Sequence, residues 1–225
     1  RERGQLWIAT EYIDGLDSGQ LLREKYPSGV PRRAIDLMAH VGARALDRAH
    51  RRGLVHGGIT PANILLGDPF SKQYRIVLTD FGQHLDVNAP YAAPEELSGA
   101  EATPQSDQFS FAATLFHLLT GRVPFPDDLR VVTEFGHLHF DAAALPGDAP
   151  GLAAVFGRAF AFDPKDRFET CGAFAAALVV GGDSAAPPRP APPPAPVAAR
   201  APAAPVAAPA AEPAPSTSDR SGRSV

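Results

Sequence analysis

The stretch that decides the fold reads His56-Gly57-Gly58-Ile59-Thr60-Pro61-Ala62-Asn63-Ile64-Leu65-Leu66, and after a short gap Ile76-Val77-Leu78-Thr79-Asp80-Phe81-Gly82. The apolar runs at residues 64–66 and 76–78 are short, and a polar, turn-prone segment separates them, which predicts a small β-hairpin. Asn63 enters the first strand and Asp80 leaves the second, so an amide and a carboxylate are expected at adjacent strand ends. Such oxygens suit Mg²⁺, although loop-stabilising hydrogen bonds explain the same residues equally well.

This segment resembles the catalytic loop H-R-D-x-K-P-x-N and the metal-binding loop D-F-G of eukaryotic-type (Hanks-type) bacterial Ser/Thr protein kinases. The residues that match are His56, Pro61, Asn63, Asp80, Phe81 and Gly82. Three positions depart from the pattern, because Gly57 replaces the Arg, Gly58 the catalytic Asp and Thr60 the Lys. The resemblance therefore implies that no catalytic residue is intact, that His56 is structural, and that Asn63 and Asp80 are the remaining candidates for Mg²⁺.

Two further motifs carry the resemblance toward the C-terminus. Ala93-Pro94-Glu95 resembles the A-P-E that closes a kinase activation segment, and Asp163-Pro164-Lys165-Asp166-Arg167 resembles the late motif whose Arg pairs with that Glu. The resemblance implies a structural ion pair between Glu95 and Arg167, and a structural Asp107 that hydrogen-bonds the catalytic-loop backbone. Phe81 and Gly82 are counted with these structural residues.

Helical patterns dominate the rest of the chain. Pro31 opens a helix that runs to about Arg52, with Gly53 as its stop. The segment Ser106-Asp107-Gln108 is expected to cap a second helix, which is apolar all round and therefore buried, and which ends at Gly121. Helices over residues 151–161 and 170–180 complete the prediction, which is a mainly α, kinase-like C-terminal lobe with a hinge strand and a small hairpin.

The first residues resemble the last strand of a kinase N-terminal lobe, at residues 6–10, followed by the hinge. The resemblance implies a nucleotide site made by Thr10, Glu11, Ile13 and Leu65. An ordinary strand followed by an Asp-Gly turn explains the stretch as well. The sequence opens with Arg1 and holds neither the Gly-rich loop nor the strand Lys of a kinase, so we expect a fragment or processed product in which the N-terminal lobe is missing.

Composition narrows the functional classes and the domain organisation. A net charge of −4 gives no electrostatic case for nucleic acid, and no apolar run is long enough for a membrane span. The single Cys171 fits a reducing compartment, so we expect a cytoplasmic protein. Residues 1–182 are interpreted as the kinase-like domain. Residues 183–225, rich in Pro and Ala, are interpreted as a disordered linker or tail that serves as a spacer or as a groove-binding ligand.

Two functional hypotheses remain open, beside a third in which the chain is a decayed remnant. In the first, the chain is a pseudokinase that acts as a binding or scaffold module in signalling, with protein partners and with weak or absent binding of ATP and Mg²⁺. In the second, it is a fragment of an active Ser/Thr protein kinase. The loss of a general base, which is typically worth ~10²–10⁴-fold in rate, favours the first. Asp86 is a candidate replacement base, but no pattern fixes it near a substrate hydroxyl.

Overall fold

The computed structural model describes residues 10–67, 75–82, 90–125, 138–147 and 149–182. Of the predictions above, the strand at residues 6–10 (apart from Thr10), Asp86 and the tail at 183–225 lie outside these ranges. Thr10 itself is exposed and belongs to no strand.

A three-stranded antiparallel sheet contains the predicted hairpin. β2 (Ile64–Gly67) pairs with β3 (Arg75–Leu78), with Ile64 opposite Leu78 and Leu66 opposite Ile76. The edge strand β1 (Gly15–Asp17) adds to β2 and was not predicted. Ile64 and Leu66 point into the core, whereas Leu65 lies half-buried on the opposite face. The antiparallel register, with Ile64 opposite Leu78, places Asn63 and Asp80 at the same end of the hairpin.

A short helix follows β1 and precedes the long one. α1 (Ser18–Lys25) begins with a capping box, in which Asp17 accepts a hydrogen bond from the backbone N–H of Gln20 and Gln20 bonds back to Asp17. α2 (Arg32–His50) begins after Pro31, as predicted, and ends two residues before the predicted end. The Asp17–Gln20 pair was a readable signal for α1 that the sequence reading missed.

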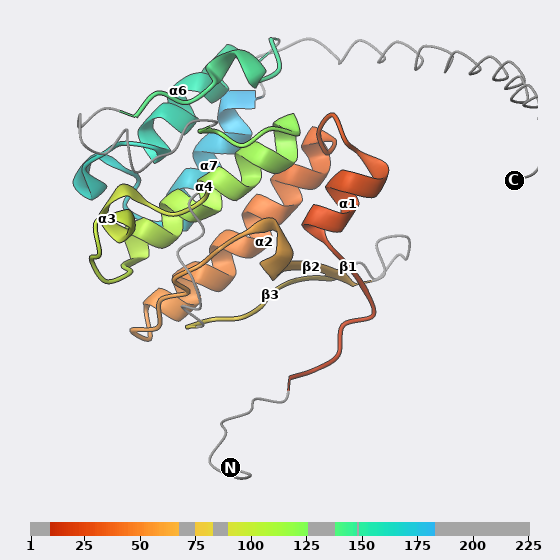
Figure 1. Cartoon of the computed structure of the whole chain (residues 1–225), viewed down its shortest axis with the longest axis horizontal. Helices are drawn as coiled ribbons and strands as arrows, with labels where there is room; N and C mark the ends of the chain where they lie inside the picture. Colours follow the sequence, from red (N-terminus) through yellow and green to blue (C-terminus); the bar gives the residue numbers. More distant parts are fainter. Residues whose placement is uncertain (1–9, 68–74, 83–89, 126–137, 148, 183–225) are drawn as a thin grey trace, which may run out of the picture. The chain divides into compact units, whose positions relative to one another are not determined.

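The buried helix α4 (Pro104–Thr120) is the centre of the structure. It contacts α2, α6 (Pro150–Ala159) and α7 (Cys171–Gly182), and Figure 1 shows it between α2 and α6. Its side chains are buried on all sides, including Phe109, Phe111 and Phe116. Burying one such ring contributes about 1.5–3 kcal/mol. The helix thus supplies apolar surface on which α2, α6 and α7 pack.

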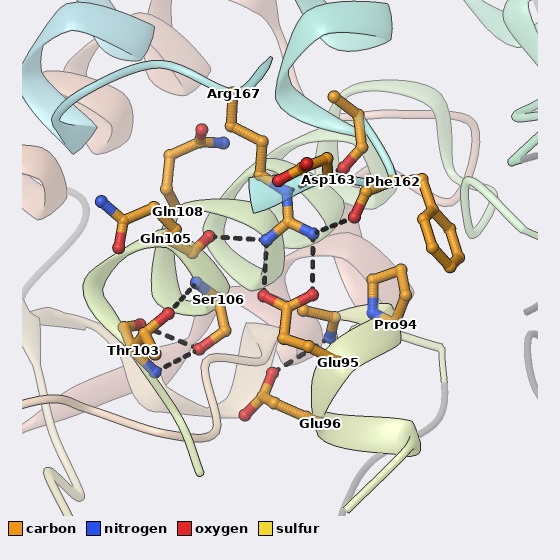
Figure 2. Close-up of polar contacts among 12 residues, drawn as sticks. Pro94, Glu95, Glu96, Thr103, Gln105, Ser106, Gln108, Phe162, Asp163 and Arg167 are labelled. Carbon is orange, nitrogen blue, oxygen red and sulfur yellow. Dashed lines mark hydrogen bonds and ion pairs between the residues drawn. The ribbon is translucent and has the colours of Figure 1, made fainter. Parts of the chain in front are cut away.

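The predicted start of α4 was wrong by three residues. Thr103 is the N-cap, because its hydroxyl accepts a hydrogen bond from the backbone N–H of Ser106, and the Ser106 hydroxyl in turn receives the N–H of Thr103 (Figure 2). Pro104 stands at the first helical position, where its fixed φ suits the helix and its missing N–H costs nothing. At the other end Gly121 has a φ of 72° and ends the helix, as predicted.

The remaining elements are short. They are the 3₁₀ turns η1 (Pro61–Asn63), η3 (Ala142–Ala144) and η4 (Pro164–Asp166), and the helix α3 (Pro94–Leu97). η1 and β2 carry the segment that resembles a catalytic loop, while α3 and η4 carry the two halves of the predicted ion pair. No helix among the described residues is both long and apolar enough to cross a bilayer.

Candidate functional site: the catalytic-loop segment

The backbone of the loop at residues 56–61 is fixed by side chains from other elements. Asp107, at the start of α4, is 1% exposed, and its carboxylate accepts the backbone N–H of His56 and of Gly57, both at 2.8 Å. On the opposite side of the loop, Ser18 Oγ donates to the carbonyl oxygen of Pro61 at 2.7 Å, and Thr114 Oγ1 donates to that of Ile59 at 3.2 Å. These anchors come from α1 and α4, so the loop conformation depends on the packing of the whole lobe.

The hydrogen bonds to the loop backbone that the resemblance implies for Asp107 are therefore present. The contacts of Ser18 and Thr114 with the loop were not predicted. Thr114 carried a signal, because a polar residue within a helix that is apolar all round needs a hydrogen-bond partner when it is buried. Ser18 gave none in its local sequence, since its partner is 43 residues away. A close spatial neighbour at that separation is invisible to local patterns.

Asn63 and Asp80, the predicted metal residues, do come together. Asn63 Nδ2 donates to Asp80 Oδ2 at 3.3 Å, and Thr79 Oγ1 donates to the same oxygen at 3.2 Å. Asp80 has a φ of 65°, and it is the one non-glycine residue in the described ranges with a positive φ. Such a conformation costs of order 1 kcal/mol and typically persists where the surroundings impose it.

The oxygen of the Asn63 amide faces Thr60 rather than Asp80. This oxygen accepts two hydrogen bonds from Thr60, one from the backbone N–H at 3.0 Å and one from the hydroxyl at 2.7 Å. The amide nitrogen of Asn63 faces Asp80. In this orientation the Asp80 carboxylate offers oxygen atoms to a cation, and the Asn63 amide does not. Mg²⁺ takes oxygen ligands, and in this arrangement the Asn63 oxygen is bound by Thr60; Asn63 and Asp80 as Mg²⁺ ligands stay a prediction.

The residue at the position of the family's catalytic Asp has no functional group. Gly58 is exposed and has no side chain, and Gly57 stands at the Arg position with a φ of 74°, where glycine is favoured. Within the described part of the loop, the side chains that bear hydrogen-bonding groups are those of His56, Thr60 and Asn63. His56 is buried, with its ring against Phe81 at a centroid distance of 4.6 Å. This contact joins the two loops and agrees with the structural role expected of both residues.

Of the four residues predicted to bind nucleotide, only some lie close to one another. Glu11 is exposed and forms an ion pair with Arg75 of β3, at 2.8 and 3.2 Å, and this partner holds the pKa of the Glu11 carboxyl below its usual value. Ile13 is half-buried close to Gly67, at the end of β2, where its Cγ2 lies 3.2 Å from the position of an added Cβ. Leu65 lies on β2, and Thr10 is exposed. Two of the four residues thus lie along β2 and two lie in solvent.

The predicted pair of Glu95 and Arg167 is present and is shown in Figure 2. Arg167 Nη1 and Nη2 donate to the two carboxylate oxygens of Glu95 at 2.7 and 2.8 Å. The Arg167 side chain is fully buried and that of Glu95 is 17% exposed. The pair links α3 to the turn η4 and holds the end of the activation segment on the lobe.

A second contact at the end of that segment joins Tyr91 to α4. The Tyr91 hydroxyl is hydrogen-bonded to His117 Nδ1 at 2.7 Å, and the rings are stacked with centroids 5.9 Å apart. Burial raises the pKa of Tyr91 to about 12 and lowers the pKa of His117. Burial also lowers the pKa of His56, against the attraction of Asp107.

These two histidines predict a loss of stability in mild acid. Because their pKa values in the folded chain lie below the ordinary value of 6.5, the unfolded chain binds more protons as the pH falls through 6.5. The free energy of unfolding then decreases with decreasing pH. Urea midpoints at about pH 7.5 and about pH 5.5 test this, with a lower midpoint expected at the acid value.

His117→Gln is expected to reduce this pH dependence, because one of the two groups is gone. His139→Gln is the matched control, since His139 is exposed, and it should leave the pH profile unchanged. A midpoint that stays constant or rises on acidification would contradict the prediction.

Comparison with known proteins shows which family the chain belongs to. The family model described as "Protein kinase domain" matches residues 1–143. The Ser/Thr protein kinase PknF of Mycobacterium tuberculosis is 41% identical over 192 residues, which cover 78% of this chain and 40% of PknF. PknJ of the same species is 36% identical over 213 residues, which cover 84% of this chain and 36% of PknJ. The chain thus spans well under half the length of these curated relatives.

A solved structure agrees with the fold. The crystal structure of the Mycobacterium tuberculosis PknI kinase domain superimposes with a TM-score of 0.69 at 35% identity, over 80% of this chain and 67% of the PknI chain. The predicted kinase-like fold is therefore confirmed. On the family match and these identities, the chain belongs to the protein kinase domain family and is a homologue of the Hanks-type Ser/Thr kinases of mycobacteria.

Proposed function

We propose that this chain is a pseudokinase domain, a kinase-like module that binds protein partners in signalling and does not transfer phosphate at a kinase's rate. The observation that carries the proposal is the pair of departures at Gly58 and Thr60 inside a loop whose backbone anchors are intact. Gly58 offers no base, and Thr60 turns the Asn63 oxygen away from Asp80. A single cysteine suits the reducing cytoplasm, where we place the module.

Two catalytic contributions are lost together in this arrangement. A positioned general base is worth ~10²–10⁴-fold in rate, and a cation on the transferred phosphoryl group contributes electrostatic stabilisation of the transition state. The structural contacts of Asp107, Glu95 and Arg167 remain. A site that keeps its frame and loses its reacting groups fits a binding role better than catalysis.

The alternative is a fragment of an active Ser/Thr kinase. It is favoured by the contact of Asn63 with Asp80 and by the 41% identity to PknF. In that case Asp80 and Asn63 would still hold Mg²⁺ with ATP, after the Asn63 amide has turned and broken its bonds to Thr60.

Phosphate transfer and nucleotide binding distinguish the two. The purified chain is incubated with ATP, Mg²⁺ and a general protein substrate, beside an Asp80→Ala variant. We expect incorporation no greater than that of Asp80→Ala, a cooperative thermal melt without nucleotide, and no rise in melting temperature from ATP that depends on Mg²⁺. The melt is essential, because a scaffold must fold without a nucleotide.

Each opposite result has a defined meaning. Incorporation above the Asp80→Ala level would overturn the pseudokinase proposal. A rise in melting temperature that needs both ATP and Mg²⁺, and that Asp80→Ala removes, would restore the nucleotide site and call for the Gly58→Asp, Thr60→Lys double variant. A chain without a cooperative melt would overturn the binding module and favour a fragment whose function needs further residues.

A further inference from the structure

A cluster of metal-binding groups lies away from the residues considered above for ATP and Mg²⁺, where α7 begins beside the end of α2. Asp47 and His50 come from α2, three residues apart on one helix face, and Cys171 is the first residue of α7. One ligand atom from each residue lies within 4.8 Å of the other two. The Cys171 side chain is buried, while Asp47 and His50 are partly exposed, so the cluster has an entrance from solvent.

His50 is held as a metal-ligating histidine usually is. Its Nε2 lies 2.7 Å from Asp107 Oδ2, and the same carboxylate is fixed by the backbone N–H groups of His56 and Gly57. With Nε2 carrying the proton toward Asp107, the imidazole lone pair is on Nδ1. A carboxylate behind the imidazole is a recurrent feature of zinc sites, because it fixes the tautomer and raises the basicity of the ligand.

Asp47 is likewise fixed by backbone. Its Oδ1 and Oδ2 accept the N–H groups of Cys171 and Gly172, each at 3.0 Å, which leaves further lone pairs on both oxygens. Gly172 permits this approach, since an added Cβ would lie 2.7 Å from Asp47 Oδ2. Burial, together with the nearby carboxylates of Asp47 and Asp107, raises the pKa of the Cys171 thiol well above its ordinary value.

We propose that Asp47, His50 and Cys171 form a Zn²⁺ site that joins α2 to α7. Thiolate, imidazole and carboxylate together are zinc ligands, and three protein ligands leave the fourth tetrahedral position to water. Zinc bonds of about 2.0–2.3 Å place tetrahedral ligand atoms about 3–4 Å apart, so binding draws the three side chains slightly closer. The metal would connect two helices that pack against each other. This site does not depend on the proposed function.

Cobalt(II) provides a selective test, because Cys171 is the only cysteine in the 225 residues. A thiolate-to-cobalt charge-transfer band in the near ultraviolet can arise from no other residue. The full chain, reduced and freed of metal, is titrated with Co²⁺ and then with Zn²⁺. We expect the band to appear at one equivalent, to disappear when Zn²⁺ displaces Co²⁺, and Zn²⁺ to raise the melting temperature.

Variants separate this site from accidental binding. Cys171→Ser should remove the band and the zinc-dependent rise in melting temperature, and Asp107→Asn should weaken metal binding about 10–100-fold through His50. His40→Gln and His139→Gln are matched controls on exposed histidines and should change neither signal. Absence of the band in the unmodified chain would overturn the proposal whatever the stability of the variants. A zinc-dependent rise that survives in Cys171→Ser would also overturn it.

Discussion

Arg167→Ala is expected to lower the free energy of unfolding by about 3–5 kcal/mol, the usual cost of removing one partner of a buried ion pair. All five N–H groups of the guanidinium are used. Two reach the Glu95 carboxylate, and the others reach the carbonyl oxygens of Ala161, Gln105 and Phe162 at 2.8, 3.1 and 3.2 Å (Figure 2). Alanine would leave a carboxylate that is 17% exposed and three carbonyl oxygens without this partner.

Urea denaturation of both proteins at neutral pH measures the difference. Arg167→Lys should not restore stability, because an ammonium group has three donors and cannot form the two-pronged contact with Glu95. Arg158→Ala is the matched control. Arg158 is exposed, with its guanidinium 4.4 Å from the centre of the Phe168 ring and its Nη2 donating to the backbone carbonyl oxygen of Arg167 at 3.4 Å, so its loss should cost about 1 kcal/mol or less.

A double variant shows whether the loss belongs to the pair. Glu95→Ala and Arg167→Ala each leave a partner unsatisfied, so together they should cost clearly less than the sum of the single changes. Equal, small losses in Arg167→Ala and Arg158→Ala would show that the pair does not hold α3 on the lobe.

The sequence predicted α2, α4, α6, α7 and the hairpin because their signals are local. Pro31, Gly121 and the all-apolar surface of α4 are each decided by neighbouring residues. Glu95–Arg167 could also be paired in advance, through the resemblance, although 72 residues separate them. The Thr103 cap was missed because the reading began the helix at a polar run and overlooked Pro104 as a first helical residue.

The candidate site was predicted less completely, because its geometry depends on contacts between distant segments. That Asn63 and Asp80 meet follows from the hairpin register, but the direction of the Asn63 amide does not. It is set by the Thr60 hydroxyl, whose preference for a local acceptor competes with the metal role. The Asp47, His50 and Cys171 cluster joins residues up to 124 positions apart, and no periodicity brings them together.

Asp107→Asn is expected to have the second large effect. It should lower the free energy of unfolding by about 2–4 kcal/mol. The measurement is made without metal, so that a bound zinc ion contributes nothing to the difference. The carboxylate accepts three hydrogen bonds, with Oδ1 receiving Gly57 N–H and Oδ2 receiving both His56 N–H and His50 Nε2. Asparagine has one oxygen, so its NH₂ group must face a donor on one side.

The same substitution tests whether the loop is held from α4 rather than by its own sequence. Amide hydrogen exchange at Gly57 should speed up more than global unfolding predicts, because its acceptor is gone while the rest of the lobe persists. Asp36→Asn is the control, since Asp36 makes a partly exposed ion pair with Arg32 and should cost about 0.5 kcal/mol or less. If exchange at Gly57 followed global unfolding alone, the loop would not depend on Asp107. In that case the presence of Asp107 would not explain why this loop, which lacks the catalytic Asp, keeps a kinase-like backbone.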